Sequence, residues 1–387
     1  MTAEVIGMRI LIVASEFPPG PGGIGTHAHQ LATELHRLGH EIRVVANFDH
    51  APPERIAEFI ARQPFTVHPL ARIPGAPLKL GYRYALLRTA IARWRPDVVL
   101  ASGDREIYAA ALARRGVPWI CVEHGRRPLA SWEKSVKRWA FGRADRVIAV
   151  SDYSRAQLLE LGARPRAIGV IHNGADALRF GPRPPGDKAA VLVELGLASA
   201  HFILSIGNVS ERKGQDIMIS AMPAVIEKIP DAHYLVVGKP TKTPEYAALT
   251  SRLGVADRVH FLGQVEPARL LQLLGACDLH VMTSRHTPDE FEGFGIAVVE
   301  AALCEKPSVV SGSSGLTEAI VDGETGLVAR LADPVDTARA VIEILGDDVR
   351  RARMAQAAHA HASEHQTWEH CAKSYETALA EVAAARR

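Results

Sequence analysis

The sequence lacks the features of a secreted, nucleic-acid-binding or membrane-spanning protein. It has only four cysteines in 387 residues, and none forms a Cys-x-x-Cys pair, so neither a disulfide framework nor a zinc site is indicated. The first apolar run, Ile10 to Ala14, is too short to cross a bilayer and lacks signal-peptide flanks. The formal net charge of +2 is too small to indicate nucleic acid as a partner. We therefore expect a cytoplasmic protein in a reducing compartment, with no nucleic-acid partner.

Metal-binding patterns are also lacking. No Asp-x-Asp stands at the end of a predicted strand. His27, His29, His36 and His40 lie around the first predicted helix, where a spacing of four could mimic a zinc pair, but no cysteine or carboxylate cluster accompanies them. We expect these histidines to lie on a polar helix face. The sequence predicts no metal and no cofactor.

What the sequence does contain is a regular alternation of short aliphatic runs and amphipathic stretches. This pattern is typical of βαβ units around a parallel sheet, and it predicts an α/β fold. The predicted strands are Arg9–Ala14, Ile42–Ala46, Val98–Ala101, Trp119–Val122, Arg146–Val150 and Ala167–Ile171, then Phe202–Ile206, His233–Val237, Val259–Leu262, Leu279–Met282, Ser308–Val310 and Gly326–Ala329.

The length and one irregular stretch indicate two domains. A chain of 387 residues exceeds what one hydrophobic core usually sustains. Arg179 to Lys188 holds three prolines and two glycines, which favour a linker. We predict a doubly wound domain at 1–180, a second at 181–365, and a C-terminal helix at 366–387, for which packing back on the first domain is one arrangement.

A glycine-rich turn follows the first predicted strand. Gly20, Gly22, Gly23 and Gly25 precede a predicted helix from Thr26 to Leu38. Such a turn lets backbone N–H groups approach a phosphate or an acceptor at the helix N-terminus. The alternative is a tight turn that needs glycine for its geometry alone. The spacing is not that of the dinucleotide motif.

A second candidate turn runs from Gly207 to Asp216. Lys213 stands at a predicted helix start, where the helix dipole disfavours a cation, so an anion such as a diphosphate would compensate. The alternative is a solvated lysine beside Glu211.

The segment from Glu290 to Ala301 carries the strongest signal. Glu292 precedes Gly293 and Gly295, whose amides could bind a phosphate, and Glu300 lies in an apolar helical run where a bare carboxylate is costly. The alternative is a helix cap and a buried acid paired with arginine.

Taken together, these motifs resemble one known family. The retaining glycosyltransferases of family 4, with the GT-B fold of two Rossmann-like domains facing a central cleft, are similar over essentially the whole chain. The resemblance is carried by Gly22-Gly23, His124 in Glu123-His124-Gly125, Val150-Ser151, Asn173-Gly174-Ala175-Asp176, Arg212-Lys213-Gly214, and the pair Glu292 and Glu300.

The resemblance implies a role for each matching residue. Glu300 would bind the donor ribose, Lys213 the diphosphate, and Glu292 would lie near the sugar hydroxyls. His124 would face the donor sugar, and Gly23 would approach the diphosphate or the acceptor. The predicted catalytic residues are His124, Lys213 and Glu292, and the predicted donor-binding residues are Gly23, Asn208, Arg212, Lys213, Gln264, Val265, Glu292, Gly293, Phe294, Gly295 and Glu300.

The sequence departs from the family pattern at one position. Family members commonly have an arginine five residues before the lysine, and this chain has Asn208 there. Arg212, adjacent to Lys213, is expected to point elsewhere. Gln264 and Val265, after the strand Val259–Leu262, are placed to meet the base.

The implied reaction is transfer, with retention, of a sugar from a UDP- or GDP-linked donor to a glycan, lipid-linked or small-molecule acceptor. The alternatives are a nucleotide-sugar epimerase or phosphorylase on the same fold, and a non-catalytic nucleotide-sugar binding module. The oligomeric state is not predicted.

The stretch from Ser131 to Arg143 adds a hypothesis about location. At helical spacing Trp132, Val136 and Trp139 share one face, and Lys134, Lys137, Arg138 and Arg143 form a basic rim. Such a helix could attach the protein peripherally to the inner face of a membrane. The alternative is an ordinary core-facing helix with a solvated basic side.

Overall fold

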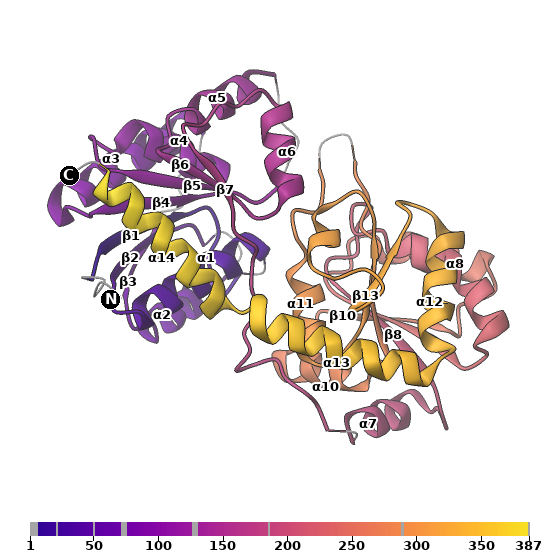
Figure 1. The fold of residues 1–387 in the computed structure, drawn as a ribbon. Helices are drawn as coiled ribbons and strands as arrows, with labels where there is room; N and C mark the ends of the chain where they lie inside the picture. The colour runs from indigo at the N-terminus through magenta and orange to yellow at the C-terminus, as the bar shows by residue number, and fades with distance from the viewer. Residues whose placement is uncertain are drawn as a thin grey trace. The chain divides into compact units, whose positions relative to one another are not determined.

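The computed structural model describes residues 7–20, 22–48, 51–70, 76–125, 131–184, 186–287 and 290–385. These residues form two compact units (Figure 1). Unit 1 combines the described residues of 7–124, 131–173 and 368–385, and unit 2 comprises those of 174–367 together with Gly125. Each unit is built on its own parallel sheet, which confirms the prediction of two doubly wound α/β domains.

The sheet of unit 1 has seven strands in the order β3-β2-β1-β4-β5-β6-β7. All its pairings are parallel, and the order reverses between β1 and β4, where ligands bind in open α/β sheets. The strands are β1 Arg9–Ala14, β2 Glu41–Ala46, β3 Thr66–Pro69, β4 Val98–Ser102, β5 Trp119–Glu123, β6 Arg146–Ala149 and β7 Ile168–Val170.

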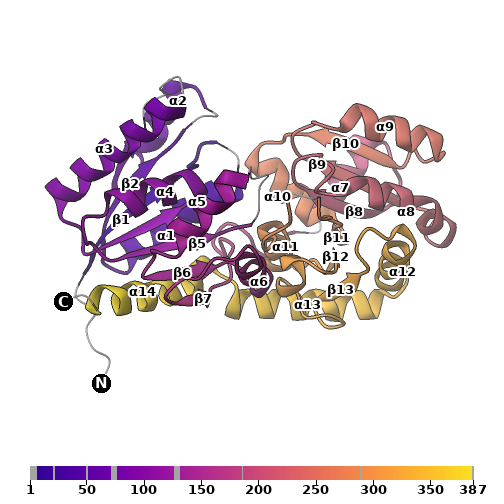
Figure 2. The same ribbon diagram turned by 90° about the horizontal axis from the view of Figure 1, so that it is seen from above.

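Helices cover both faces of this sheet. α14 packs against α1, β4 and β5, and lies along the sheet beside α1 (Figures 1 and 2). The other face packs on α3 and α4 around the buried side chains of Trp119 and Phe141. The helices of unit 1 are α1 Gly23–Arg37, α2 Pro53–Ala61, α3 Ala76–Trp94, α4 Asp104–Ala113, α5 Ser131–Phe141, α6 Asp152–Glu160 and α14 Trp368–Ala384.

Unit 2 repeats the plan with six strands in the order β10-β9-β8-β11-β12-β13. The order reverses between β8 and β11. The strands are β8 His201–Ile206, β9 Ala232–Val237, β10 Val259–Gly263, β11 Leu279–Met282, β12 Ser308–Ser311 and β13 Gly326–Ala329.

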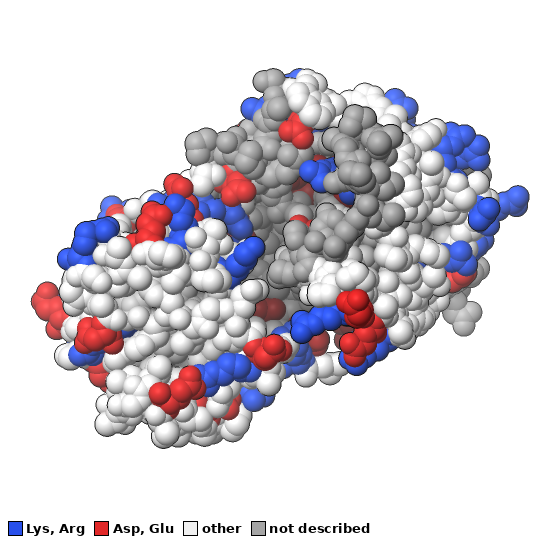
Figure 3. Space-filling view, turned by 180° about the vertical axis from the view of Figure 1, so that it is seen from behind, with Lys and Arg blue, Asp and Glu red and all other residues white. Residues whose placement is uncertain are grey.

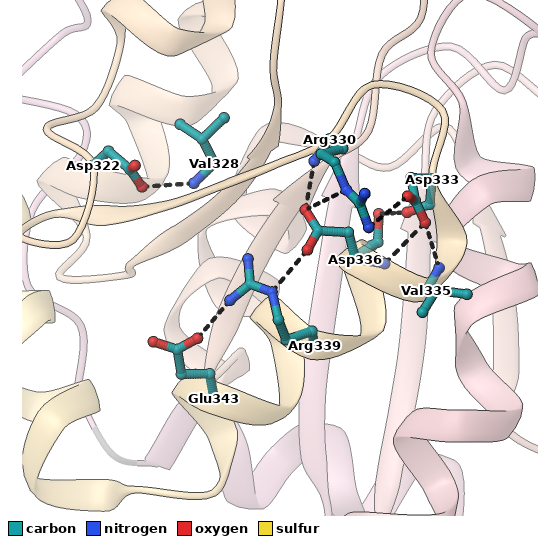
Figure 4. A network of polar contacts seen from close by, with 9 residues as sticks. Asp322, Val328, Arg330, Asp333, Val335, Asp336, Arg339 and Glu343 are labelled. Carbon is teal, nitrogen blue, oxygen red and sulfur yellow. Dashed lines mark hydrogen bonds and ion pairs between the residues drawn. The ribbon is translucent and has the colours of Figure 1, made fainter.

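The helices of unit 2 close a core between the sheet, α8 and α12. Asp333 caps α12 by accepting hydrogen bonds from the N–H groups of Val335 and Asp336, each at 3.0 Å (Figure 4). On the next turn Arg339 pairs with both Asp336 and Glu343 at 2.7 Å. The helices are α7 Gly186–Leu195, α8 Gln215–Lys228, α9 Thr243–Arg252, α10 Pro267–Ala276, α11 Ile296–Leu303, the 3-10 turn η1 Gly315–Glu318, α12 Pro334–Leu345 and α13 Asp348–His365.

The predicted linker is wrong in its second half, because α7 begins at Gly186. The chain passes between the units at Asn173–Gly174 and again at Thr367–Trp368. At these places the Ala175 N–H donates to the Gln366 carbonyl at 2.9 Å, so the two crossing segments pair side by side.

Candidate functional site

The cationic turn of unit 2 sits where the strand order reverses. It follows β8, and its last residue, Gly214, caps α8 in the left-handed conformation at φ 66°. A Cβ at Gly214 would lie 2.0 Å from the Thr283 carbonyl oxygen, just beyond β11, so only glycine fits. The Thr283 hydroxyl donates to the Gly214 carbonyl at 2.7 Å. Lys213 is thereby fixed between the carboxyl ends of β8 and β11.

Three donors converge on the carboxylate of Glu292. Lys213 Nζ lies 2.8 Å, Arg212 Nη1 2.5 Å and the Ser284 hydroxyl 3.2 Å from Glu292 Oε2. The expectation that Arg212 points elsewhere is therefore wrong. The turn preceding α8 carries both side chains to the same acid, and the Arg285 N–H donates to the Arg212 carbonyl at 2.8 Å, which fixes the turn.

Burial and pairing set the charges of this cluster. The side chains of Lys213 and Glu292 are only 15% and 13% exposed. Loss of solvent opposes ionisation of Glu292, but Lys213 and then Arg212 outweigh it and lower its pKa to about 2. Burial lowers the pKa of Lys213 even though Glu292 opposes that shift. Because desolvation of both side chains offsets their attraction, the pair adds little net stability. The Lys213 ammonium is still partly exposed and remains available to an anionic ligand.

Glycines shape the chain after Glu292. Gly295 caps α11 at φ 105°, and a Cβ there would lie 2.4 Å from Leu316 Cδ2. A Cβ at Gly315 would lie 1.9 Å from the Gly293 carbonyl oxygen, and the Gly315 N–H donates to the Glu292 carbonyl at 3.1 Å. Phe294 is buried between them. These contacts hold the backbone at the start of α11, the positive end of the helix dipole.

Glu300 lies one helix turn further on α11 and is half-buried. No side chain or backbone group of the described residues donates a hydrogen bond to its carboxylate. Burial raises the pKa of Glu300 to about 7, with Arg179 opposing and Asp176 adding to the shift. A carboxylate in this state gains from hydroxyl donors on a ligand.

The remaining predicted residues of unit 2 lie at the same edge of the sheet. Asn208 is exposed after β8, while Gln264 is exposed and Val265 half-buried after β10. The Gly238 N–H donates to the Gly263 carbonyl at 2.8 Å, which links the ends of β9 and β10. Their predicted contact with a nucleobase stays a prediction.

Sequence reasoning missed two supporting residues, Gln215 and Ser284. Buried Gln215 accepts from the Ser210 N–H at 3.3 Å and donates to the Asn208 carbonyl at 3.1 Å, so it braces the loop before Lys213. Ser284 donates the hydroxyl hydrogen bond to Glu292. Their positions directly after a glycine turn and a strand were the only available signal.

In unit 1, His124 follows β5 and is held by Ser102 at the end of β4. The Ser102 hydroxyl lies 2.8 Å from His124 Nε2. Burial, and then the Lys137 cation, lower the pKa of His124 to about 4, so the imidazole is neutral at pH 7.

Gly22 and Gly23, at the turn before α1, differ in what explains the glycine. Gly22 has φ 154°, a backbone conformation that residues with a Cβ rarely adopt, whereas the Glu16 carboxylate 2.2 Å from its Cβ position is flexible and could move. A Cβ at Gly23 would meet no described atom within 4 Å. Backbone conformation therefore accounts for Gly22, and nothing within the described chain accounts for Gly23.

The expectation that the histidines around α1 lie on a polar helix face is wrong for two of them. His27 and His40 are buried, and they contact Tyr375 and Glu376 of α14 at 3.2 and 2.9 Å. His29 contacts Gln63 at 2.9 Å. Across the described ranges, no group of three or more His, Cys, Asp or Glu could hold a metal ion. The four cysteines are free and buried.

Helix α5 differs from its predicted basic rim at one residue. Trp132 and Trp139 are 66% and 41% exposed, but Lys137 is buried against Glu123 at 2.7 Å and Asp104 at 3.3 Å. Because α5 packs on α4, its Lys137 faces inward, and it does not belong to the rim.

Comparison with known proteins now decides the family. The family model described as "Glycosyl transferases group 1" matches residues 195–361, and the one described as "Glycosyltransferase Family 4" matches residues 21–179. The glycogen synthase of Mycobacterium tuberculosis is 30% identical over 411 residues, covering 97% of this chain and 94% of that protein. The chain belongs to glycosyltransferase family 4.

Two further proteins are similar to this chain. The D-inositol 3-phosphate glycosyltransferase of Nocardia farcinica is 33% identical over 76% of this chain, which spans 64% of that relative's length. The crystal structure of Anabaena HepE in complex with UDP is 25% identical, with a TM-score of 0.81, covering 97% of this chain and 100% of that one. The latter confirms the predicted GT-B fold. The name of the former supports glycosyltransferase activity.

In the part of the chain that the structure describes, no helix is both long and apolar enough to cross a membrane.

Proposed function

We propose that the protein is a retaining, metal-independent glycosyltransferase that uses a UDP- or GDP-linked sugar as donor. The observation that carries the proposal is the Arg212, Lys213 and Glu292 cluster at the strand-order reversal of unit 2. Two cations held at the carboxyl edge of a parallel sheet suit a diphosphate, because that is where such sheets bind phosphorylated ligands. HepE binds UDP on the same fold, which supports a uridine nucleotide.

Lys213 would act on the leaving group. It pairs with Glu292, which holds the ammonium in place. As the bond between the sugar C1 and the diphosphate oxygen breaks, negative charge grows on the diphosphate, and a preorganised cation stabilises that charge. Arg212, on the same carboxylate, would be the second cation where Asn208 replaces the usual arginine.

In the proposed route to retention, the acceptor hydroxyl attacks C1 on the face from which the diphosphate departs. A new bond forms between C1 and the acceptor oxygen, and a β-phosphate oxygen takes the acceptor proton. No residue of the protein needs to act as nucleophile, and no metal is needed for the leaving group.

The other predicted residues would bind the donor. Glu300 would accept from the ribose hydroxyls, since its half-buried carboxylate receives no hydrogen bond within the described chain. The amides of Gly293, Phe294 and Gly295 would meet the phosphate and the sugar at the start of α11. Neutral His124 would face the sugar, and Gly23 would leave room for the diphosphate or the acceptor.

The test is donor turnover with and without acceptors. The purified chain is incubated with UDP- and GDP-sugars and a panel of glycans, glycolipids and phosphorylated cyclitols, and nucleoside diphosphate release and product anomeric configuration are measured. We expect release that depends on the acceptor, with the donor's anomeric configuration kept in the product. Inversion would contradict retention.

The same measurements separate the alternatives. Isomerised donor without an acceptor would indicate an epimerase, and phosphate-dependent cleavage would indicate a phosphorylase. Tight nucleotide-sugar binding without any turnover would indicate a binding module. A thermal-shift panel run in parallel identifies the nucleotide, because ligand at 100 times its Kd adds about 2.7 kcal/mol of stability.

We further propose peripheral association of unit 1 with an anionic membrane through α5. Trp132 is the most exposed aromatic of the helix, and Lys134, Arg138 and Arg143 remain for the basic rim. Arg143 lies over the Trp139 ring at 5.3 Å. On the face in Figure 3, basic side chains lie among acidic and uncharged ones, so attraction to an anionic surface would have to be local.

Co-sedimentation with liposomes tests this attachment. With each basic residue contributing about 1 kcal/mol, we expect weak binding to anionic vesicles that is lost at high salt and in Trp132→Ala. Equal, negligible binding to anionic and neutral vesicles at low salt would show that α5 is a structural element only.

A further inference from the structure

The ring of His27 connects the C-terminal helix to His124. His27 is buried on α1, and its ring meets three others edge to face. The ring centroids lie 4.6 Å from His124 at an interplanar angle of 79°, 5.5 Å from Tyr375 at 65° and 5.8 Å from Trp368 at 75°. These geometries are the favoured ones for aromatic pairs.

One polar contact fixes the rotation of the His27 ring. Its Nε2 lies 3.2 Å from the Tyr375 hydroxyl, which is itself buried, and the tautomer decides which atom donates. The other ring nitrogen, Nδ1, is buried without a hydrogen-bond partner among the described residues. Without Tyr375, nothing polar in the described chain would distinguish one orientation of the His27 ring from the flipped one.

His124 is held from two sides. The Ser102 hydroxyl lies 2.8 Å from His124 Nε2, and the His27 ring packs against the His124 ring. With Nε2 occupied, Nδ1 is the nitrogen that can meet a ligand hydroxyl. The direction of Nδ1 therefore depends on Ser102 and on His27 together.

We propose that Tyr375 and Trp368 of α14 are positioning residues for His124 and act through the ring of His27. The inference rests on the proposed role of His124 in facing the donor sugar. Trp368 is the first residue of α14, directly after the second crossing of the chain into unit 1. Docking of the C-terminal helix thus sets the orientation of an imidazole that the sequence separates from it by more than 240 residues.

This arrangement predicts a specific kinetic signature. Donor affinity should come mainly from unit 2, through Lys213 and Glu300, whereas a displaced His124 should weaken the alignment of the sugar as it reacts. Small displacements of an aligned group reduce turnover strongly, so we expect kcat to fall by roughly 3- to 10-fold in Tyr375→Phe while KM for the donor changes little.

The experiment compares neighbouring residues of the same helix in the full-length protein. Tyr375→Phe removes only the hydroxyl on His27, and Glu376→Gln weakens the contact with His40 at 2.9 Å, a second tie of α14 to unit 1. His27→Gln, which lacks the ring, and His124→Ala complete the set. Each variant is tested for kcat, KM, thermal unfolding and imidazole NMR signals, with the His27 and His124 signals assigned from their own variants.

We expect Tyr375→Phe and His27→Gln to lower kcat and to shift the His124 imidazole signals, while Glu376→Gln leaves both unchanged. An equal loss of kcat in Tyr375→Phe and Glu376→Gln would show general loosening of α14 and would overturn the inference. Unchanged His124 signals and kcat in Tyr375→Phe, beside an inactive His124→Ala, would overturn it as well.

The same set of variants shows separately whether the proposed role of His124 fails. If His124→Ala retains full turnover, the role of His124 in the reaction is wrong, whatever Tyr375→Phe does to its NMR signals. Should Tyr375→Phe fail to fold, His27→Gln gives the same comparison against Glu376→Gln.

Discussion

Glu292 of unit 2 and His124 of unit 1 both stand beyond the carboxyl end of a central strand, yet they are held by different forces. Two cations and a hydroxyl surround the Glu292 carboxylate and keep it ionised, with its pKa at about 2. A hydroxyl and an aromatic ring hold the His124 imidazole, and burial keeps it neutral, with its pKa at about 4.

This difference indicates which charged side chains can bind a ligand and which ones stabilise the fold. The cations of unit 2 are partly exposed at the sheet edge, so an anionic ligand can reach them. In unit 1, Lys137, whose charge lowers the pKa of His124, has a side chain only 3% exposed and already pairs with Glu123 and Asp104. We therefore expect loss of Lys137 to affect stability and loss of Lys213 to affect turnover.

The largest expected effect is the loss of stability in Lys137→Met. Its removal leaves the buried Glu123 carboxylate without its cation, which costs about 3–5 kcal/mol of unfolding free energy. Urea unfolding followed by circular dichroism measures the loss. Lys373→Met, an exposed lysine of α14, is the control and should unfold as the wild type does. A Lys137→Met protein as stable as its control would mean that the buried pair does not support unit 1.

Lys213→Met should have the opposite outcome and lower turnover without unfolding the protein. Removing one preorganised charge from the leaving group lowers kcat by about 10²- to 10³-fold, while the fold survives because Arg212 still pairs with Glu292. Steady-state kinetics with the donor found in the turnover test measure the loss of kcat. The matched control is Lys242→Met, an exposed lysine of unit 2. Wild-type kcat in folded Lys213→Met would remove Lys213 from the proposed site.

Glu300→Gln should give a smaller, pH-dependent effect. Burial raises the pKa of Glu300 from 4.5 to about 7, so its stabilising contribution is complete below pH 4.5 and is lost as pH rises through 7. Because Glu300 is only half-buried, we expect a moderate difference in the free energy of unfolding. Without ligand, the variant should be more stable than the wild type by about 1–2 kcal/mol at pH 8 and equally stable at pH 4.5.

Urea unfolding at both pH values measures this difference, with exposed Glu305→Gln as the control. Nucleotide sugar should reverse the order, because the variant loses the proposed contact with ribose and hence donor affinity. A pH-independent difference would show that the Glu300 carboxyl is not perturbed by burial.

The smallest expected effect is that of metal removal. If the cations and helix N-termini neutralise the diphosphate, excess EDTA should change kcat by less than about twofold. Initial rates before and after treatment, with added Mg²⁺ or Mn²⁺ as the control, measure it. Complete loss of activity that either ion restores would overturn the proposal of metal independence.

Much of the fold could be predicted because it depends on local pattern. The strands Arg9–Ala14 and Leu279–Met282 have their predicted bounds, since central parallel strands are continuous apolar runs. β3 was missed because it is an edge strand in which only Val67 is buried, so Thr66–Pro69 carries no apolar run. The α7 start was missed because prolines and glycine obscure a helix beginning at Gly186.

The two parallel sheets, the glycine turns and the acids and cations that follow the strands could be predicted, because they depend on residue type and spacing along a short segment. Tertiary structure alone decided that Arg212 joins Lys213 on Glu292, that Lys137 faces inward, and that Tyr375 meets His27. The physical reason is that side-chain direction and long-range contact follow from how helices pack on a sheet. Residues far apart in sequence acquire a common environment only when that packing forms.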